Sequence, residues 1–171
     1  MLLLAAHPAA PMILTLKTPA ATAAMARAFA RAAAAADVLP AVLMNGQLGA
    51  GKTTFVRALV ELLPGSENAE VGSPSFNLVN LYPTMPPVAH FDLYRTAGQG
   101  FSADLEEVLE SGAFCLVEWA EFLPEASRPE SFVTMDWDVK DDARTVHFTT
   151  NNDQVIGTLR ESFATTPIHD D

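Results

Sequence analysis

The sequence predicts a single α/β domain in which helices flank one sheet of mixed parallel and antiparallel strands. Two observations predict this fold. Uninterrupted apolar runs, which are typical of strands buried on both faces, alternate with helical segments early in the chain. Later, two runs of alternating apolar residues surround a short polar turn, as in a hairpin. The 171 residues, of which 49% are hydrophobic, suit one domain with its own core.

The first part of the chain predicts a strand, a helix and a second strand. Residues 13–16 are apolar or β-branched and read as a short strand. Thr18 is a suitable N-cap and Pro19 suits the first helical position, so the alanine-rich run to about Ala36 is predicted to be a helix. The apolar run 41–44 that follows is typical of a strand covered on both faces.

The middle of the chain predicts one helix and two strands. A helix is expected over 52–63, ended by Pro64 and Gly65. A polar, proline-containing stretch then leads to strands over 76–82 and 88–92.

The next helix is predicted to begin at Asp104, with Glu107 forming an Asp-based relative of the capping box, and to end at Gly112. A buried strand over 113–117 follows and ends at Glu118.

The end of the domain is predicted to be an antiparallel hairpin. Apolar residues alternate over 133–139 and again over 146–148, with the polar segment 140–143 between them. The domain is therefore expected to span 12–163. Residues 1–11 are predicted to form a disordered extension, since they lack the features of a signal peptide, and residues 164–171 a frayed tail. Whether Met1 or Met12 is the true start stays open.

The composition limits the classes of function. A net charge of −11 and ten scattered Lys and Arg residues argue against an extended contact with a nucleic-acid backbone. A role in nucleic-acid chemistry would therefore use a protein partner. Cys115 is the single cysteine, which argues against a disulfide framework and favours a reducing, cytoplasmic location. No stretch is long and apolar enough to span a membrane.

A glycine-rich loop follows the strand 41–44 and opens the helix at Lys52. Such a loop directs backbone N–H groups at a phosphate, and the helix N-terminus favours negative charge. Lys52 is expected to reach the β- and γ-phosphates, and the Thr53 hydroxyl to bind Mg²⁺. The sequence therefore predicts a P-loop NTPase fold. The loop consists of Gly46, Gln47, Leu48, Gly49, Ala50, Gly51, Lys52 and Thr53.

Two acidic residues each end an apolar strand. Asp92 ends the strand 88–92, and Glu118 follows the strand 113–117. Either can be a solvated acid, but together they suggest one carboxylate for Mg²⁺ and one to orient the attacking water. Spacing does not decide which does which.

Further side chains near these acids have two interpretations each. Ser73 and Ser75 can contact phosphate or metal, although a plain turn entering a strand is the better interpretation. His90 is more often a structural histidine than a catalyst. Trp119 can face the nucleotide or belong to the core.

The nucleotide is predicted to be ATP. Guanine-specific enzymes of this class carry an Asn-Lys-x-Asp motif, whereas residues 139–142 read Val-Lys-Asp-Asp and lie in a predicted turn. Two alternatives stay open beside an ATPase: a nucleotide-dependent binding switch with negligible hydrolysis, and a small-metabolite kinase. A kinase needs an arginine-bearing lid, and no arginine-rich lid segment is present.

The motifs resemble those of the TsaE family, the ATPase component of bacterial tRNA threonylcarbamoyladenosine synthesis. The resemblance runs from about Thr18 to Leu123. Four motifs carry it in order: Gly-x-Leu-Gly-Ala-Gly-Lys-Thr-Thr at Gly46–Thr54, Ser-Pro-Thr-Phe at Ser73–Phe76 with Ser75 in place of Thr, His-x-Asp-x-Tyr-Arg at His90–Arg95, and Glu118-Trp119.

The resemblance implies specific roles and partners. Lys52, Thr53 and Thr54 would bind phosphate and Mg²⁺, Glu118 would be the magnesium-associated acid, Asp92 would be needed for hydrolysis, and Trp119 would lie close to the nucleotide. Family members work with TsaB and the TsaD transferase on the adenosine beside the anticodon of tRNAs that read codons beginning with A. The resemblance also implies that ATP hydrolysis drives the cycle of this complex.

Overall fold

The computed structural model of the protein describes residues 12–35, 39–74, 77–96 and 102–166. The extension predicted for residues 1–11 lies outside these residues, as do Ser75 and the end of the predicted tail.

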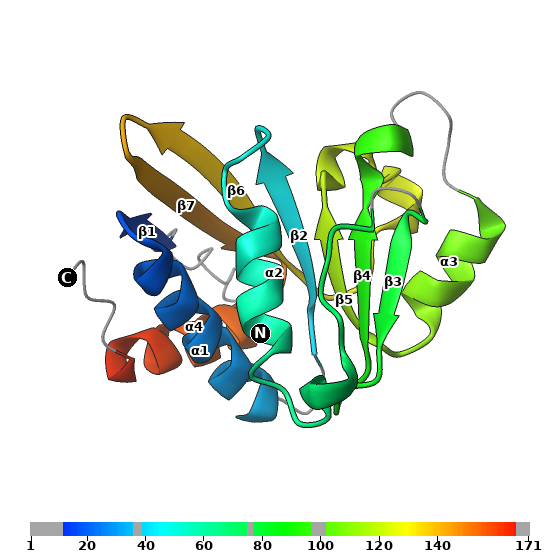
Figure 1. Cartoon of the computed structure of the whole chain (residues 1–171), viewed down its shortest axis with the longest axis horizontal. Helices are drawn as coiled ribbons and strands as arrows, with labels where there is room; N and C mark the ends of the chain where they lie inside the picture. The colour runs from blue at the N-terminus through cyan, green and yellow to red at the C-terminus, as the bar shows by residue number, and fades with distance from the viewer. Residues whose placement is uncertain (1–11, 36–38, 75–76, 97–101, 167–171) are drawn as a thin grey trace, which may run out of the picture.

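Seven strands within the described residues form one sheet in the order β1-β7-β6-β2-β5-β4-β3 (Figure 1). At its centre β2 is parallel to both β5 and β6, and β4 is parallel to β5. The outer pairs β3–β4, β6–β7 and β7–β1 are antiparallel. The predicted mixed sheet is thus confirmed. The strands are β1 (Met12–Leu16), β2 (Ala41–Gly46), β3 (Val79–Tyr82), β4 (Val88–Asp92), β5 (Phe114–Glu118), β6 (Phe132–Lys140) and β7 (Ala143–Thr150).

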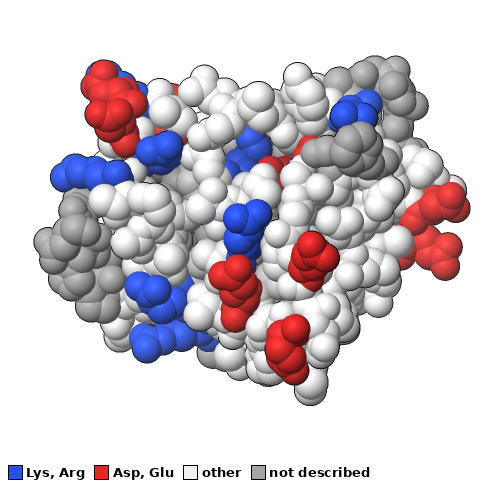
Figure 2. Space-filling model, viewed as in Figure 1, with Lys and Arg blue, Asp and Glu red and all other residues white. Residues whose placement is uncertain are grey.

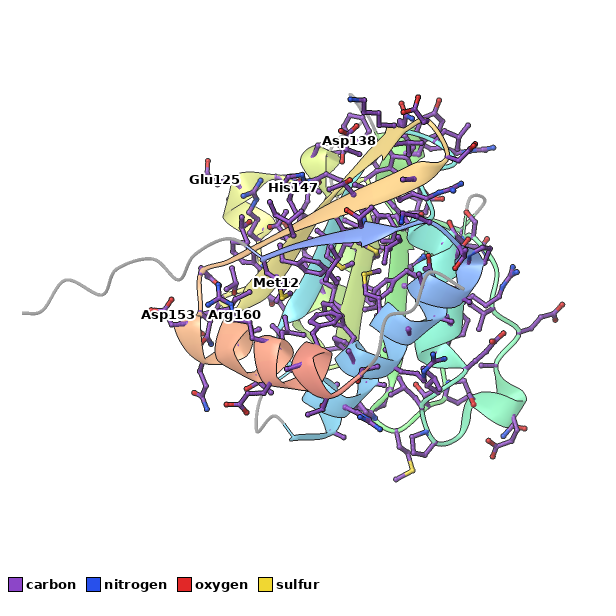
Figure 3. All side chains as sticks on the ribbon, turned by 90° about the vertical axis from the view of Figure 1, so that its left-hand side faces the viewer. Met12, Glu125, Asp138, His147, Asp153 and Arg160 are labelled. Carbon is purple, nitrogen blue, oxygen red and sulfur yellow. The ribbon has the colours of Figure 1, made fainter. Side chains whose placement is uncertain are left out.

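The predicted hairpin is formed by β6 and β7. Lys140 pairs with Ala143, so Asp141 and Asp142 make a two-residue turn. Asp141 has a left-handed φ of 54°, which an aspartate tolerates better than most residues. Figure 3 shows this antiparallel half of the sheet from the side, with His147 on β7 and Met12 on the neighbouring β1.

The helices cover both faces of the sheet. The helices α1, α2 and α4 pack on one face together with Val42 and Met44 of β2. The helix α3 packs on the other face, where Ala41 and Leu43 of the same strand point. Because alternate residues of β2 enter different cores, its segment 41–44 must be apolar throughout. The helices are α1 (Pro19–Ala35), α2 (Lys52–Val60), α3 (Ala103–Glu110) and α4 (Asp153–Thr165).

Of the two predicted helix N-caps, one is confirmed and one is wrong. Thr18 caps α1, since its Oγ1 accepts a hydrogen bond of 3.1 Å from the backbone N–H of Ala21. The cap of α3 is Ser102 and not Asp104, because the Ser102 side chain accepts from the N–H of Leu105. Asp104 instead lies in the first turn, where its charge favours the helix dipole.

The helix α4 has no counterpart among the predicted elements. It begins after Asn152, whose side chain accepts a hydrogen bond of 3.1 Å from the N–H of Gln154. Ile156 and Leu159 are buried in the core that α4 shares with α1. The helix continues through Thr165, two residues beyond the predicted end of the domain.

Two further features concern the described helices and the single cysteine. None of the helices in the described ranges has the length and apolar character needed to cross a membrane. Cys115 is buried in β5, and this burial raises the pKa of its thiol to about 11.

Candidate nucleotide-binding site

The carboxyl ends of the parallel strands β2, β4 and β5 meet at one edge of the sheet, where ligands commonly bind in open α/β sheets. A cavity of about 390 Å³ opens there. Figure 2 shows basic and acidic atoms together in a hollow beside the start of α2. The cavity is lined by Leu48, Gly49, Ala50, Gly51, Lys52, Thr53, Thr54, Ser73, Asp92, Tyr94, Glu118 and Trp119.

The glycine-rich loop owes its shape to Trp137 of the neighbouring strand β6. Gly46 pairs with Trp137 in register, and a Cβ on Gly46 would lie 2.5 Å from the Trp137 carbonyl oxygen. A Cβ on Gly51 would lie 3.3 Å from the Trp137 ring. Both glycines also have left-handed φ values, of 131° and 112°. Side chains at these positions would therefore force the loop away from β6.

The loop residues divide between the cavity wall and its support. Leu48 to Thr54 line the cavity, as expected for phosphate-binding residues at the start of a helix. Gly46 and Gln47 do not line it. Their carbonyl oxygens instead accept hydrogen bonds from the Lys52 ammonium group.

Lys52 is buried, with 3% of its surface exposed, and its ammonium group lies 4.0 Å from the centre of the Trp119 ring. This is the geometry of a cation–π contact. Burial lowers the pKa of Lys52, while the nearby carboxylates of Glu118, Glu121 and Asp92 act in the opposite direction. The loop carbonyls and the indole thus hold the lysine at the cavity wall.

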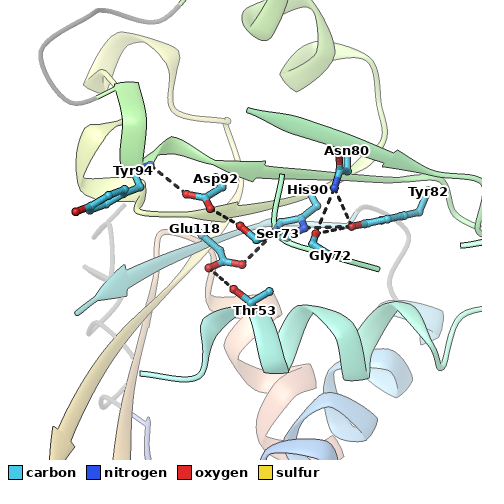
Figure 4. Close-up of polar contacts among 9 residues, drawn as sticks. All are labelled: Thr53, Gly72, Ser73, Asn80, Tyr82, His90, Asp92, Tyr94 and Glu118. Carbon is cyan, nitrogen blue, oxygen red and sulfur yellow. Dashed lines mark hydrogen bonds and ion pairs between the residues drawn. The ribbon is translucent and has the colours of Figure 1, made fainter. Parts of the chain in front are cut away.

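The two strand-end acids are neighbours, because Asp92 and Glu118 pair in register on β4 and β5. Both are buried. Their partners differ, as Figure 4 shows. Thr53 donates a hydrogen bond of 2.9 Å to Glu118, whereas Ser73 donates one of 2.7 Å to Asp92. Asp92 also accepts a bond of 3.1 Å from the backbone N–H of Tyr94.

The residues around Thr53 fit a magnesium ion. The Thr53 hydroxyl and the Glu118 carboxylate supply oxygen donors, which Mg²⁺ prefers. No three His, Cys, Asp or Glu side chains within the described ranges are grouped as an all-protein metal site. This matches the usual arrangement for Mg²⁺ beside a nucleotide, in which few protein ligands are completed by phosphate oxygens and water.

Trp119 lies in the cavity wall and also packs on the core beneath α3. Its φ of 59° is left-handed, which is rare for a bulky residue and often marks a functional position. The Trp119 ring contacts that of Tyr94, with centroids 4.8 Å apart. Tyr94 is half-exposed and lines the same cavity, a role that the sequence reasoning did not assign.

Ser73 reaches the cavity from the position just before a turn. The backbone N–H groups of Asn77 and Leu78 both donate to the Pro74 carbonyl at 2.8 Å, so the predicted turn is present. The Ser73 side chain nevertheless lines the cavity and binds Asp92. The two interpretations of Ser73 are therefore compatible.

His90 is completely buried, as the structural interpretation requires, but its partner is a residue of the site. Its Nε2 lies 2.9 Å from Glu118 Oε1. On the other side of the ring, Nδ1 lies 3.4 Å from the hydroxyl of Tyr82. The sequence reasoning did not single out Tyr82. The register that places it beside this part of β4 could not be read from the sequence.

The comparisons with known proteins agree on one family. The family model for the threonylcarbamoyl adenosine biosynthesis protein TsaE matches residues 16–146. A tRNA threonylcarbamoyladenosine biosynthesis protein TsaE from Bacillus subtilis is 34% identical over 132 residues, which cover 77% of this chain and 80% of that protein. The protein of the same name from Rickettsia felis is 40% identical over 91 residues, which cover 52% of each chain. The chain thus spans about half the length of this Rickettsia relative.

A solved structure extends the similarity to most of the fold. The crystal structure of YdiB from Bacillus subtilis superposes with a TM-score of 0.69 at 26% identity, covering 92% of this chain and 97% of that one.

Proposed function

We propose that this chain, which belongs to the TsaE family, binds and hydrolyses Mg-ATP in support of the threonylcarbamoyladenosine modification of tRNA. The observation that carries the proposal is the convergence of Lys52, Thr53 and Glu118 on one cavity behind a glycine-rich loop. That set matches what a nucleotide phosphate chain requires: backbone donors, a cation and oxygen ligands for a metal.

Each of these residues has a distinct task in the proposal. The N–H groups at the start of α2 donate hydrogen bonds to the phosphate oxygens, and the Lys52 ammonium group exchanges its loop carbonyls for phosphate oxygens. Thr53 and Glu118 would hold Mg²⁺, which when bound neutralises charge on the phosphate oxygens. Asp92, which accepts a hydrogen bond from Ser73, would orient the attacking water.

Hydrolysis by the chain alone is proposed to be slow. Among the described residues Lys52 is the only Lys or Arg in the cavity wall, so no arginine stands ready to stabilise the transferring phosphoryl group. In other P-loop enzymes an arginine supplied by a partner raises the rate by roughly 10³ to 10⁵. TsaB and TsaD are the proposed partners. With a net charge of −11, the chain would act on tRNA indirectly through them.

A nucleotide-dependent binding switch is the second candidate function. The same lack of an arginine in the described cavity wall favours it, because a switch needs the nucleotide cradle and no catalytic arginine. It differs from an ATPase only in turnover by the assembled complex.

Calorimetry with the isolated chain tests the binding part of the proposal. Mg-ATP and Mg-ADP are expected to bind more tightly than the corresponding guanine nucleotides. Equal affinity for ATP and GTP would contradict the choice of base, and no affinity for either would contradict the proposed function.

A further inference from the structure

We propose that Tyr82 and His90 are positioning residues that couple the segment Val71–Pro74, here called the strap, to the Glu118 carboxylate. The inference rests on the proposed function, because it assumes that Glu118 and Thr53 belong to a magnesium-nucleotide site. It assigns His90 a role beyond that of a core residue. It also adds Tyr82 and Asn80 to the residues that matter for the site.

The coupling runs through an unbroken chain of polar contacts, which is buried at Tyr82, His90 and Glu118 and half-buried at its two ends (Figure 4). The Gly72 carbonyl accepts from the Tyr82 hydroxyl at 3.1 Å. That hydroxyl lies 3.4 Å from His90 Nδ1, and His90 Nε2 lies 2.9 Å from Glu118 Oε1. The other carboxylate oxygen, Oε2, accepts from Thr53 at 2.9 Å. The chain therefore begins on the strap and ends on α2.

The hydrogen bonds in this chain depend on one another, because each side chain has a limited number of protons to donate. A carboxylate only accepts hydrogen bonds, so His90 must donate through Nε2–H to Glu118. In the neutral ring Nδ1 is then an acceptor. The Tyr82 hydroxyl has one proton and two acceptors within reach, the Gly72 carbonyl and His90 Nδ1. A stronger bond to one of them weakens the bond to the other.

The strap also makes hydrogen bonds that do not involve His90. Asn80 donates through its side-chain amide to the same Gly72 carbonyl at 3.2 Å. The next residue of the strap, Ser73, donates to Asp92. Both acids of the site therefore connect to the strap: Asp92 directly, and Glu118 through His90 and Tyr82.

The consequence is that the strap and the metal-binding end of the cavity do not move independently. If the Glu118 carboxylate shifts when Mg-nucleotide binds, the strength of its bond to His90 changes. The Tyr82 proton is then redistributed between His90 and Gly72. The groups of such a polar chain respond to one another, because leaving a buried group without a partner costs its full desolvation penalty.

The test follows two sets of NMR resonances in the full chain. The ¹³C resonance of the Gly72 carbonyl and the imidazole ¹⁵N resonances of His90 are recorded with ADP alone and after Mg²⁺ is added. We expect the His90 spectrum of an Nε2–H tautomer. We also expect that Mg²⁺ shifts both the His90 and the Gly72 resonances of the wild type. A wild-type His90 in the other tautomer, or a Gly72 carbonyl that does not respond to Mg²⁺, would overturn the proposal.

Two matched variants separate coupling from simple loosening of the strap. Tyr82→Phe removes the hydroxyl that links Gly72 to His90. Asn80→Ala removes the other donor to the same carbonyl, together with the 3.4 Å contact of that amide with the Tyr82 hydroxyl, but leaves the hydroxyl in place. Tyr82→Phe is expected to lose the Mg²⁺-dependent shift of Gly72 while His90 still responds. Asn80→Ala is expected to change the resting Gly72 resonance and to keep its response. A full response in Tyr82→Phe would contradict the coupling.

Substitutions at His90 provide an independent comparison. His90→Gln keeps an amide donor near the position of Nε2, and His90→Asn keeps polar atoms only near Nδ1. In the wild type we expect Mg²⁺ to raise the affinity for ADP. His90→Gln is expected to retain much of this increase and His90→Asn to lose it. Equal loss in both variants would mean that the ring serves packing alone. The amide resonances of Gly49 and Gly51 report nucleotide binding separately. If they do not respond to ADP in the wild type, the proposed function fails, whatever His90 does.

Discussion

Thr53 Oγ1 donates a hydrogen bond of 2.9 Å to Glu118 Oε2 and so joins the first turn of α2 to the carboxyl end of β5. This bond distinguishes Glu118 from Asp92, which instead accepts from Ser73. The spacing of the two acids in the sequence could not show which of them binds Mg²⁺ and which orients the attacking water. The partners in the structure support the metal role for Glu118 and the water-orienting role for Asp92.

The first prediction concerns these two acids. Glu118→Gln and Asp92→Asn are expected to lower the rate of phosphate release by roughly 100-fold or more, the usual effect of losing a group that handles a proton or metal. ADP affinity should fall much less, because the loop amides and Lys52 remain. Phosphate release and calorimetry measure the two effects. Asp138→Asn, at an exposed position of β6, is the matched control. Full turnover in both site variants would refute the paired-acid account.

The second prediction concerns Lys52. Replacing it with alanine removes a charge-assisted phosphate contact and should weaken binding of ATP and ADP by roughly 10- to 100-fold. Arg57→Ala removes the same charge from an exposed position of the same helix and should leave the affinity unchanged. Similar losses in both variants would mean that the lysine contributes only general electrostatics.

The third prediction uses the two tryptophans. With Trp137→Phe, the remaining fluorescence comes from Trp119 in the cavity wall and should change when ADP binds. The contact between Lys52 and the indole would be lost as the ammonium group turns to the phosphates. Trp119→Phe provides the reference signal from Trp137. An unchanged Trp119 signal at saturating ADP would show that this ring serves the core alone.

Local sequence signals predicted much of the fold and of the site. The motif 46–53, the cap at Thr18 and the hairpin turn at Asp141 could each be recognised from neighbouring residues, although the packing of the loop on Trp137 could not. The helix α4 depends on distant contacts. Gly157 and adjacent β-branched residues weaken its helical tendency, and packing such as that of Phe163 against Phe29 of α1 compensates.

The contacts among the acids, His90 and Tyr82 were less predictable, because they depend on the order of the strands in the sheet. Asp92 and Glu118 were recognised as strand-end acids, but only the pairing of β4 with β5 makes them neighbours. Tyr82 reaches His90 because β3 returns antiparallel to β4, a register that no short motif encodes. His90 itself was recognised, although its contact with Glu118 was not.

The central claim is that this chain uses ATP to sustain tRNA modification by its proposed partners. The most direct measurement counts threonylcarbamoyl-modified adenosines per TsaD over time, with the cognate TsaB–TsaD pair alone, with this chain added, and with its Lys52→Ala variant. Phosphate release is recorded in the same reactions and with the chain alone. We predict that the pair stimulates ATP hydrolysis by this chain, and that repeated rounds of modification require the wild type and fail with Lys52→Ala. Repeated rounds without the chain, together with no stimulation of hydrolysis by the pair, would contradict the claim.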